Sequence, residues 1–191
     1  GSARDSLWYA GSFTVPTGAP PDSVVLPITV ESTTGLFTVG RVTIRIASAD
    51  TGNLVPNYSF EIDGNRDGIP DTWRSYVKGF DYDVSGNHAR SGRRAIHVRN
   101  DSLTDFRGIS LRIDLKQTEA KPIELAGWSK SLDVSGGPDN DYALYVDAWY
   151  TDGTPLYGQT ARFSTGTHDW EYSSRLITPE KPISHLLLYV L

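Results

Sequence analysis

Short segments in which apolar and polar residues alternate run through most of this chain, and Gly, Pro, Asp or Asn separate one segment from the next. In 141–150, for example, Leu144 and Val146 alternate with Tyr145 and Asp147. A period of two places successive side chains on opposite faces of an extended strand, with one face on a core. No segment shows a convincing helical period, so the alternation predicts an all-β chain.

The segments that fit this pattern are bounded by turn-forming residues at short intervals. Many short strands at this spacing indicate a β-sandwich or a β-barrel. The strands that we predict are 23–31, 36–46, 94–100, 107–115, 122–132, 141–150, 159–163, 170–177 and 184–191.

Composition narrows the class of protein. With 191 residues the chain can bury a substantial core, as one large domain or as a domain with an additional fragment. A net charge of -5 does not favour a nucleic-acid partner. No apolar run of about 18 residues is present to span a membrane. Cysteine is absent, which excludes disulfides, a thiolate nucleophile and a cysteine zinc site.

The start of the chain and its composition bear on localisation. The chain opens with Gly-Ser and no methionine, so an export signal can have been removed from it. A chain without cysteine is compatible with the cytosol, or with export in a bacterium where the core and a metal ion provide the stability. The abundance of Gly, Tyr, Thr, Ser and Asp favours the second reading, and we expect a secreted bacterial protein.

An internal similarity suggests that the chain contains parts of two related units. Each copy consists of a Trp, a strand that ends near a Pro, and an apolar run. The residues are Trp8, Pro16 and 24–26 in the first copy, and Trp170, Pro179 and 186–188 in the second. We therefore interpret residues 1–50 as resembling the last strands of a preceding unit, and 53–191 as the main domain. One hypothesis is that the strand 36–46 completes the sandwich of 53–191, as in a circular permutant.

A loop near the start of the main domain carries an oxygen-bearing side chain at every second position. The pattern D-x-N-x-D-G-x-x-D is formed by Asp63, Asn65, Asp67, Gly68 and Asp71. Calcium prefers carboxylate, amide and carbonyl oxygens on a loop that wraps it, and a Gly at the sixth position permits the bend. The twelfth position is Arg74 where an EF-hand has a bidentate acid, so the loop is not an EF-hand. The alternative is a solvated turn without an ion.

Four motifs in order carry a family resemblance. Residues 53–61 read N-L-V-P-N-Y-S-F-E, 69–73 read I-P-D-T-W, 91–95 read S-G-R-R-A, and 125–130 read L-A-G-W-S-K. Over residues 53–191 the chain resembles carbohydrate-binding modules of the family 4/9/22 type. The resemblance implies a galactose-binding-like β-jelly roll of two antiparallel sheets, a structural calcium ion, and a carbohydrate site on the concave sheet or at the loop rim.

The resemblance also bears on the calcium ligands. It adds Glu61 of the Phe-Glu motif as a candidate. The family takes a second acidic ligand from a closing strand, where this chain has Gly40-Arg41-Val42. Because this chain lacks that acidic residue, the acidic loop becomes the more favoured source of calcium ligands. The candidate calcium ligands are Glu61, Asp63, Asn65, Asp67, the Ile69 carbonyl and Asp71.

Sugar recognition combines an aromatic platform with planar polar side chains on a rigid, shallow surface. On strand 141–150 the non-core face carries Tyr145, Asp147 and Trp149, and on 107–115 it carries Arg112 and Asp114. On 122–132, Trp128 has the same parity as Lys130 and Glu124. We expect Tyr145, Asp147, Trp149, Arg112, Asp114 and Trp128 to line one groove. The alternative is that loops or the N-terminal segment cover these aromatic residues.

Three functions remain open at this point. The favoured one is a non-catalytic carbohydrate-binding module of a larger secreted polysaccharide-processing protein, tethered to a catalytic domain. The second is a structural or adhesive surface module without a sugar site. The third is a glycosidase in which Asp147 acts with Asp114 or Glu124. No phosphate loop, nucleophile elbow or H-E-x-x-H motif is present, so we expect no catalytic activity.

Overall fold

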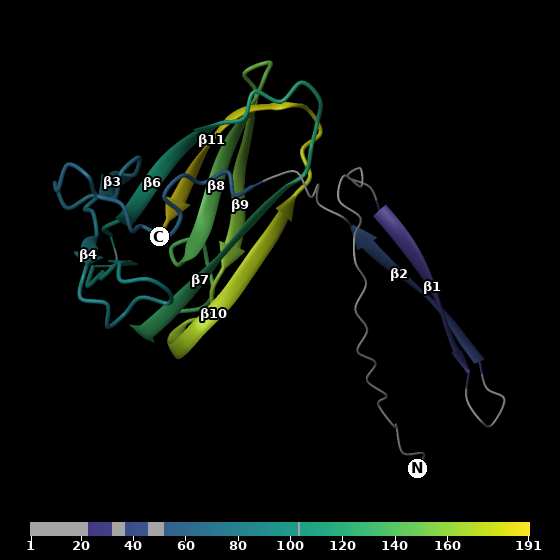
Figure 1. Cartoon of the computed structure of the whole chain (residues 1–191), viewed down its shortest axis with the longest axis horizontal. Coiled ribbons are helices and arrows are strands. Elements are labelled where there is room, and N and C mark those ends of the chain that lie inside the picture. The colour runs from purple at the N-terminus through teal and green to yellow at the C-terminus, as the bar shows by residue number, and fades with distance from the viewer. Residues whose placement is uncertain (1–22, 32–36, 46–51, 103) are drawn as a thin grey trace, which may run out of the picture. The chain divides into compact units, whose positions relative to one another are not determined.

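The structure is a computed structural model that describes residues 23–31, 37–45, 52–102 and 104–191 (Figure 1). The chain divides into two compact units, Gly1–Gly52 and Asn53–Leu191. In the first unit, β1 (Ser23–Glu31) and β2 (Phe37–Arg45) pair as an antiparallel hairpin. These two strands are where the sequence predicts them. Trp8, Pro16 and the other residues of 1–22 lie outside the described residues.

The second unit contains the remaining strands. They are β3 (Arg74–Val77), β4 (Asp81–Asp83), β5 (Ala95–His97), β6 (Arg107–Asp114), β7 (Ile123–Val134), β8 (Ala143–Tyr150), β9 (Pro155–Arg162), β10 (Gly166–Ile177) and β11 (Ile183–Val190). Five of them form an antiparallel sheet in the order β3-β6-β11-β8-β9. A second sheet consists of β10 and β7, and a small one of β4 and β5.

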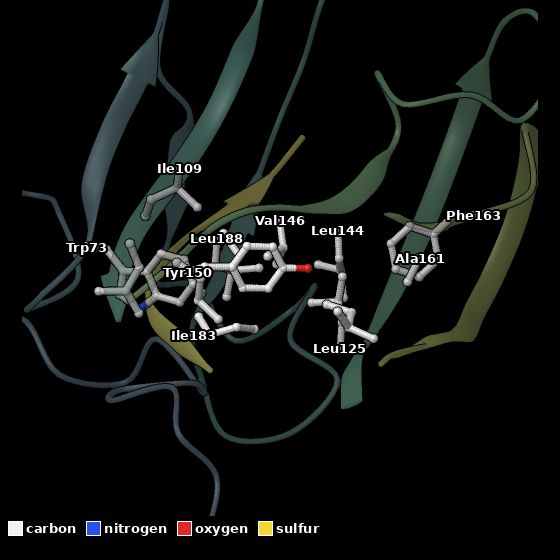
Figure 2. Close-up of a cluster of buried hydrophobic side chains, with 14 residues drawn as sticks. Trp73, Ile109, Leu125, Leu144, Val146, Tyr150, Ala161, Phe163, Ile183 and Leu188 are labelled. Carbon is white, nitrogen blue, oxygen red and sulfur yellow. The ribbon is translucent and has the colours of Figure 1, made fainter. Parts of the chain in front are cut away.

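The described residues are thus all-β and contain no helix. The five-stranded sheet and the β10-β7 sheet pack face to face, which is consistent with a β-sandwich (Figure 1). The side chains of Leu144, Val146 and Ala148 point from β8 into the space between the sheets. The second sheet supplies Leu125 to the same core (Figure 2). Ile177 of that sheet belongs to the same cluster.

Close approach of β7 to β8 depends on a glycine. A Cβ atom on Gly127 would lie 2.8 Å from Cδ1 of Leu144, which is closer than side chains pack. Gly127 has the same parity along β7 as Leu125, so the odd-numbered residues of β7 face the core. The even-numbered residues, including Trp128, therefore face outward.

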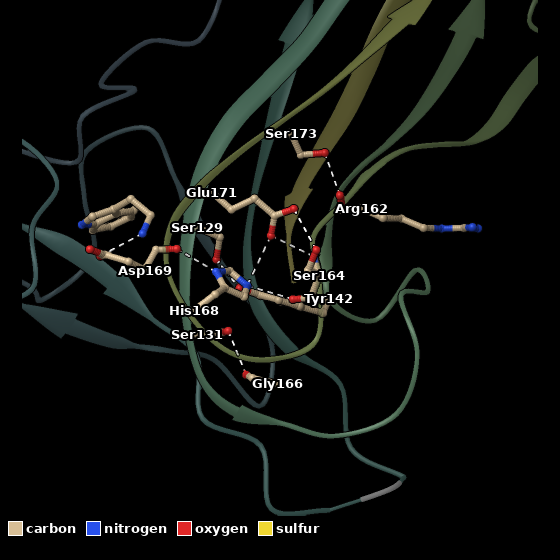
Figure 3. Close-up of polar contacts among 11 residues, drawn as sticks. Ser129, Ser131, Tyr142, Arg162, Ser164, Gly166, His168, Asp169, Glu171 and Ser173 are labelled. Atoms are coloured by element: carbon tan, nitrogen blue, oxygen red, sulfur yellow. Dashed lines mark hydrogen bonds and ion pairs between the residues drawn. The ribbon is translucent and has the colours of Figure 1, made fainter. Parts of the chain in front are cut away.

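A polar cluster holds one end of β10 against its neighbours (Figure 3). The Glu171 carboxylate accepts hydrogen bonds from the backbone N–H and the hydroxyl of Ser164 at 2.9 and 3.0 Å. Nε2 of His168 lies 3.3 Å from the same carboxylate. The register between β10 and β7 shifts on both sides of His168, so these contacts replace regular ladder bonds at a β-bulge.

Several predicted strand boundaries were wrong. The strands β3 and β4 were not predicted, because they are too short to show an alternating pattern. The predicted strand 94–100 is confined to Ala95–His97. Beyond it, Asn100 accepts a hydrogen bond from the N–H of Ser102 in a local turn. The predicted strand 159–163 begins earlier, at Pro155, which an edge strand tolerates.

The core position of Ile183 gives a test of this packing. Ile183 is 0% exposed, begins β11 and belongs to this cluster (Figure 2). We expect Ile183→Ala to lower the free energy of unfolding by about 2–5 kcal/mol, because it removes buried methyl groups and leaves a cavity. The control is Leu132→Ala, since Leu132 is 77% exposed. Its effect should stay within about 0.5 kcal/mol in denaturant unfolding. Equal midpoints for the two variants would contradict this description of the core.

Candidate functional site

The face of the five-stranded sheet that points away from the core carries most of the candidate sugar-binding residues. We call it the open face. On β8 it presents Tyr145, Asp147 and Trp149, each partly exposed and alternating with buried neighbours. On β6 it presents Arg112 and Asp114, both exposed. The structure brings these five residues to one face of one sheet, as the alternation predicts, with β11 between the two strands.

A first group of aromatic rings lies at one end of the open face. Tyr145 on β8 pairs across the ladder with Tyr189 on β11, and their ring centroids are 5.8 Å apart. Tyr76 on β3 contacts Tyr189 from the other side at 5.0 Å, edge to face. The three rings form a continuous row that crosses several strands. Such edge-to-face contacts stabilise the row beyond the area that it buries.

A second aromatic group lies about 13 Å along the same strands, four residues away at about 3.3 Å each. The indole of Trp149 stacks on the imidazole of His185 at 5.0 Å, with 6° between the ring planes. Tyr157 of β9 packs edge to face against the same indole at 5.6 Å. Tyr157 is one of the more exposed large side chains of the protein. The open face thus carries aromatic platforms at both ends.

Asp147 and Arg112 lie between the two platforms, opposite Leu187, and Asp114 lies level with His185 and Trp149. Oδ1 of Asp147 accepts a hydrogen bond from the N–H of Gly158 at 3.0 Å. Arg112 donates to Oδ1 of Asp114 through Nε at 3.0 Å and Nη2 at 2.9 Å. A planar guanidinium and two carboxylates are thereby held on a rigid sheet, where they can accept and donate hydrogen bonds to hydroxyl groups.

Trp128 does not join this face, contrary to the expectation of a single groove. It lies on the outer side of β7, in the other sheet, and the core separates it from Tyr145. There its ring packs against Tyr172 at a centroid distance of 5.2 Å. The guanidinium of Arg90 lies 3.7 Å from the Trp128 ring centroid, a cation–π geometry. Parity along β7 alone could not decide which face of which sheet carried it.

The sequence analysis missed several residues of the open face. Leu187 lies opposite both Asp147 and Arg112 in the ladders, so β11 runs through the centre of the face. Its residues His185 and Tyr189 were not assigned because the run 184–191 is apolar on both sides. Tyr76 was missed because β3 was not predicted. The alternation His185, Leu187, Tyr189 was the one signal that could have located them.

The acidic loop is built around Asn57. Its side-chain amide donates to the carbonyl of Ile62 at 2.8 Å and to that of Asp71 at 3.1 Å. Its Oδ1 accepts from the N–H of Ile62 at 3.1 Å. Asn57 has a positive φ of 50°, which Asn tolerates better than most residues. The two ends of the loop are therefore closed by one side chain, and the indole N–H of Trp73 donates to the Asn57 carbonyl at 3.2 Å.

Within the loop, side chains bond to nearby backbone. Oδ1 of Asp67 accepts from the N–H of Ile69 at 2.9 Å, and Oδ2 from the Asn65 amide at 2.9 Å. Oδ1 of Asp71 accepts from the N–H of Gly64 at 3.1 Å. These contacts fold the loop into a tight bend, in which Asp67 is exposed and Asp71 is half-buried. A groove of about 280 Å³ lies alongside, lined in part by Asn65, Asp67 and Asp71.

Asp63 is the exception in this loop. Its Oδ1 atom is buried and has no hydrogen-bond partner among the described residues. A buried carboxylate oxygen without a donor is costly, because it has lost water and gained no replacement. An oxygen-seeking cation is one group that would satisfy it.

Glu61 makes long-range contacts. Its Oε1 accepts from the N–H groups of Arg93 and Arg94 at 2.8 and 2.9 Å. Gly92 precedes them with a φ of 72°, and a Cβ atom there would collide with the Glu61 carboxylate. Glu61 therefore ties the 91–95 turn to the start of the domain. Arg94 also donates to the hydroxyl of Tyr82, and this bond is the main cause that raises the pKa of Arg94.

Two absences can be stated for the part of the chain that the structure describes. No group of three or more His, Cys, Asp or Glu side chains is arranged so that it could hold a metal ion. Likewise, no helix there has the length and apolar character needed to cross a membrane.

The order of strands in the sheets also places the carboxylate pairs that were considered for glycoside hydrolysis. Glu124 lies on the outer side of β7, so the two layers of the sandwich separate it from Asp147. Asp114 shares the open face with Asp147, but β11 runs between their strands and Asp114 is paired with Arg112. The pairing of Asp147 with Glu124 is therefore wrong.

A scan of the chain against protein-family models gave no match, and a search of curated proteins gave none either.

The environment of Tyr145 leads to a prediction about its ionisation. Partial burial, together with the nearby Asp147 carboxylate, raises the pKa of the Tyr145 phenol above its ordinary value of 10.0. Because the raised pKa favours the neutral phenol in the folded state, the associated stability is present below pH 10.0 and is lost as the pH rises through the folded-state value.

The difference between the ultraviolet pH titrations of the wild type and of Tyr145→Phe isolates the ionisation of the Tyr145 phenol. We expect the difference signal to reach its midpoint above pH 10.0. A midpoint at or below that value would contradict the described burial of the Tyr145 phenol beside the Asp147 carboxylate.

Proposed function

We propose that this protein is a non-catalytic carbohydrate-binding module with a galactose-binding-like β-jelly roll fold. It would belong to a larger secreted polysaccharide-processing protein. By holding a tethered catalytic domain on its polysaccharide, such a module raises the effective concentration of the substrate.

The observation that carries this proposal is the arrangement of the open face. Aromatic rings lie at both of its ends, Asp147 and Arg112 lie between them, and Asp114 lies level with Trp149 and His185. Aromatic rings pack on the apolar C–H faces of sugars, while carboxylate and guanidinium groups bond to the hydroxyls around the ring. A soluble protein that exposes such a cluster commonly uses it for binding. The length of the face, across two platforms, favours binding along a polysaccharide chain.

We further propose that the acidic loop holds a structural calcium ion. The unpartnered Oδ1 of Asp63 supports this proposal, as do the hydrogen bonds that hold the Asp67 and Asp71 carboxylates to the backbone of the same loop. Oxygen ligands of these types match calcium. Because no three carboxylates of the described residues are arranged around one point, the Asn65 amide and the Ile69 carbonyl would complete the set with Glu61. The ion would tie the loop closed and would take no part in sugar recognition.

The alternative function is a structural or adhesive surface module without a sugar site. The stacking of Trp149 on His185 is compatible with a purely structural role, because it buries part of both rings. Retention on polysaccharide gels distinguishes the two functions. Failure to be retained on any of a broad set of polysaccharides would exclude the carbohydrate-binding proposal and favour the adhesive one.

The first prediction concerns the aromatic platform. We expect Trp149→Ala to weaken binding to the retained polysaccharide at least about tenfold, or about 1.4 kcal/mol, because the platform loses its largest ring. Affinity gel electrophoresis measures this directly. The control is Tyr58→Ala, which removes an aromatic ring that is 64% exposed and lies outside the open face. The proposed site is wrong if the two variants bind the polysaccharide equally well.

The second prediction concerns calcium. An ion present at about 100 times its dissociation constant stabilises the folded state by about 2.7 kcal/mol. Adding EDTA should therefore lower the melting temperature of the wild type. We expect Asp63→Asn to lose most of this response, because the variant keeps the shape of the side chain and removes its charge.

A matched variant shows whether the effect is specific. Asp101→Asn removes an exposed carboxylate outside the loop, and its response to EDTA should equal that of the wild type. In the absence of calcium, Asp63→Asn should be about as stable as the wild type, because Oδ1 of Asp63 accepts no hydrogen bond that the variant would lose. A wild-type EDTA response in Asp63→Asn would show that the loop is not the site.

A further inference from the structure

The Asp147 carboxylate lies in the middle of the open face and is half-buried. No Lys, Arg or His side chain among the described residues forms an ion pair with it. Arg112 lies two strands away, beyond Leu187 on β11, and its guanidinium is already paired with Asp114 at 2.9 Å. Because a half-buried carboxylate has lost part of its water, an unpaired one favours a ligand that supplies a positive charge.

The edge strand β9 fixes the position of this carboxylate. Its residues Tyr157 and Gly158 both lie opposite Asp147, which makes a β-bulge in the ladder between β8 and β9. At the bulge Gly158 has a φ of 73° and donates its N–H to Oδ1 of Asp147 at 3.0 Å. A neutral N–H orients the carboxylate without neutralising it, and Oδ2 takes no part in this bond.

A phenol meets the carboxylate at the same point. A Cβ atom on Gly158 would lie 3.9 Å from the Tyr145 hydroxyl oxygen, so this oxygen and Oδ1 of Asp147 both lie beside one glycine. The ring of Tyr189 follows at a centroid distance of 5.8 Å from that of Tyr145. After burial, the Asp147 carboxylate is the largest cause that raises the pKa of both phenols. The carboxylate and the two phenols therefore form one group.

No member of this group carries a positive charge. Phenol oxygens accept hydrogen bonds, and the face of an aromatic ring is the negative part of its quadrupole. An ammonium group matches this surface, because its three N–H groups donate to oxygens and its charge is attracted to aromatic rings. A sulfate or a uronate would instead be repelled by Asp147. The net charge of -5 of the whole chain acts in the same direction.

A metal ion matches the same group less well. Calcium takes six to eight oxygen ligands, most of them carboxylates and carbonyls. The group offers one carboxylate, and the raised pKa values of Tyr145 and Tyr189 keep both phenols neutral at neutral pH. An organic ammonium requires only one carboxylate beside an aromatic surface.

We propose that this part of the open face binds the ammonium group of an amino sugar, so that the recognised polysaccharide carries free amino groups. Asp147 neutralises the ammonium charge, with the phenols of Tyr145 and Tyr189 beside it. Trp149 lies two residues, about 7 Å, further along β8, where it can pack on a sugar ring. Ammonium binding stands on the geometry at Asp147, whereas the identification of its carrier as a polysaccharide rests on the proposed function.

The first experiment compares glucosamine with glucose, its neutral analogue, on the whole protein. The titrations are run at constant ionic strength and at a pH at which the amine is protonated. We expect glucosamine to shift the Gly158 amide resonance saturably, and glucose to bind at least about tenfold more weakly, because it lacks the charge-assisted contact. The absence of a saturable shift with glucosamine would overturn the proposal.

The variant Asp147→Asn tests the charge itself. It keeps an oxygen that can accept from the Gly158 N–H, so its melting temperature should match that of the wild type. We expect it to weaken glucosamine binding about tenfold. The control is Asp101→Asn, which removes an exposed carboxylate outside the open face and should bind glucosamine like the wild type. Equal glucosamine binding by Asp147→Asn and the wild type, or an equal loss of glucose binding in Asp147→Asn, would overturn the proposal.

The second experiment identifies the carrier by comparing retention on a glucosamine polymer and on its N-acetylated form. N-acetylation removes the ammonium charge and keeps the sugar chain. We expect the wild type to prefer the free amine, and Asp147→Asn to lose that preference. Equal retention on both polymers overturns the amino-sugar assignment. Release of the protein by polylysine at a lower amine concentration than by the soluble glucosamine polymer also overturns it, and assigns the ammonium to a polypeptide.

The two proposals fail in different ways. Trp149→Ala should weaken retention on the polymer and keep the glucosamine shift at Gly158. If no polysaccharide retains the protein and glucosamine still binds through Asp147, the proposed module function is wrong and the ammonium site stands. If a polysaccharide without amino groups retains the protein and glucosamine does not bind, the module function stands and the ammonium site is wrong.

Discussion

Burial of one face of β8 and β11 against the second sheet is the interaction on which the rest of this structure depends. Leu144, Val146 and Leu188 are buried on that face. Leu125 and Ile177 from the opposite layer belong to the same core. Apolar burial of this kind is the main driving force of folding. Because side chains alternate along a strand, fixing these residues inward also directs Tyr145 and Asp147 outward.

The open face is therefore a consequence of the core. Strands that are packed tightly on one side form a rigid support, and the rings on the other side are held by each other and by the strands beneath them. Little conformational freedom remains to be lost when a ligand binds such a surface, which favours affinity. The edge strand β9 is held to the same support, since the Ser173 hydroxyl of β10 donates to the Arg162 carbonyl.

The acidic loop is stabilised by hydrogen bonds and not by apolar packing. Asn57 closes the loop through three hydrogen bonds, and Glu61 anchors a distant turn. Every carboxylate there either bonds to backbone N–H groups or, in the case of Asp63, has an oxygen without a partner. This concentration of oxygen atoms explains why a cation would stabilise the loop by binding only its folded form.

The sequence by itself determined the β class, most of the strands and the split of β8 into two faces, because a period of two is a local property of the chain. It also determined the acidic loop, whose pattern is contiguous. Only the tertiary structure decided which strands are neighbours. It placed β11 between β6 and β8, so that His185 and Tyr189 join the open face, and it put Trp128 on the other layer. It also brought β9 and β10 into contact at the edges of the two sheets, where the Ser173 hydroxyl donates to the Arg162 carbonyl, since contacts between layers depend on how the whole chain packs.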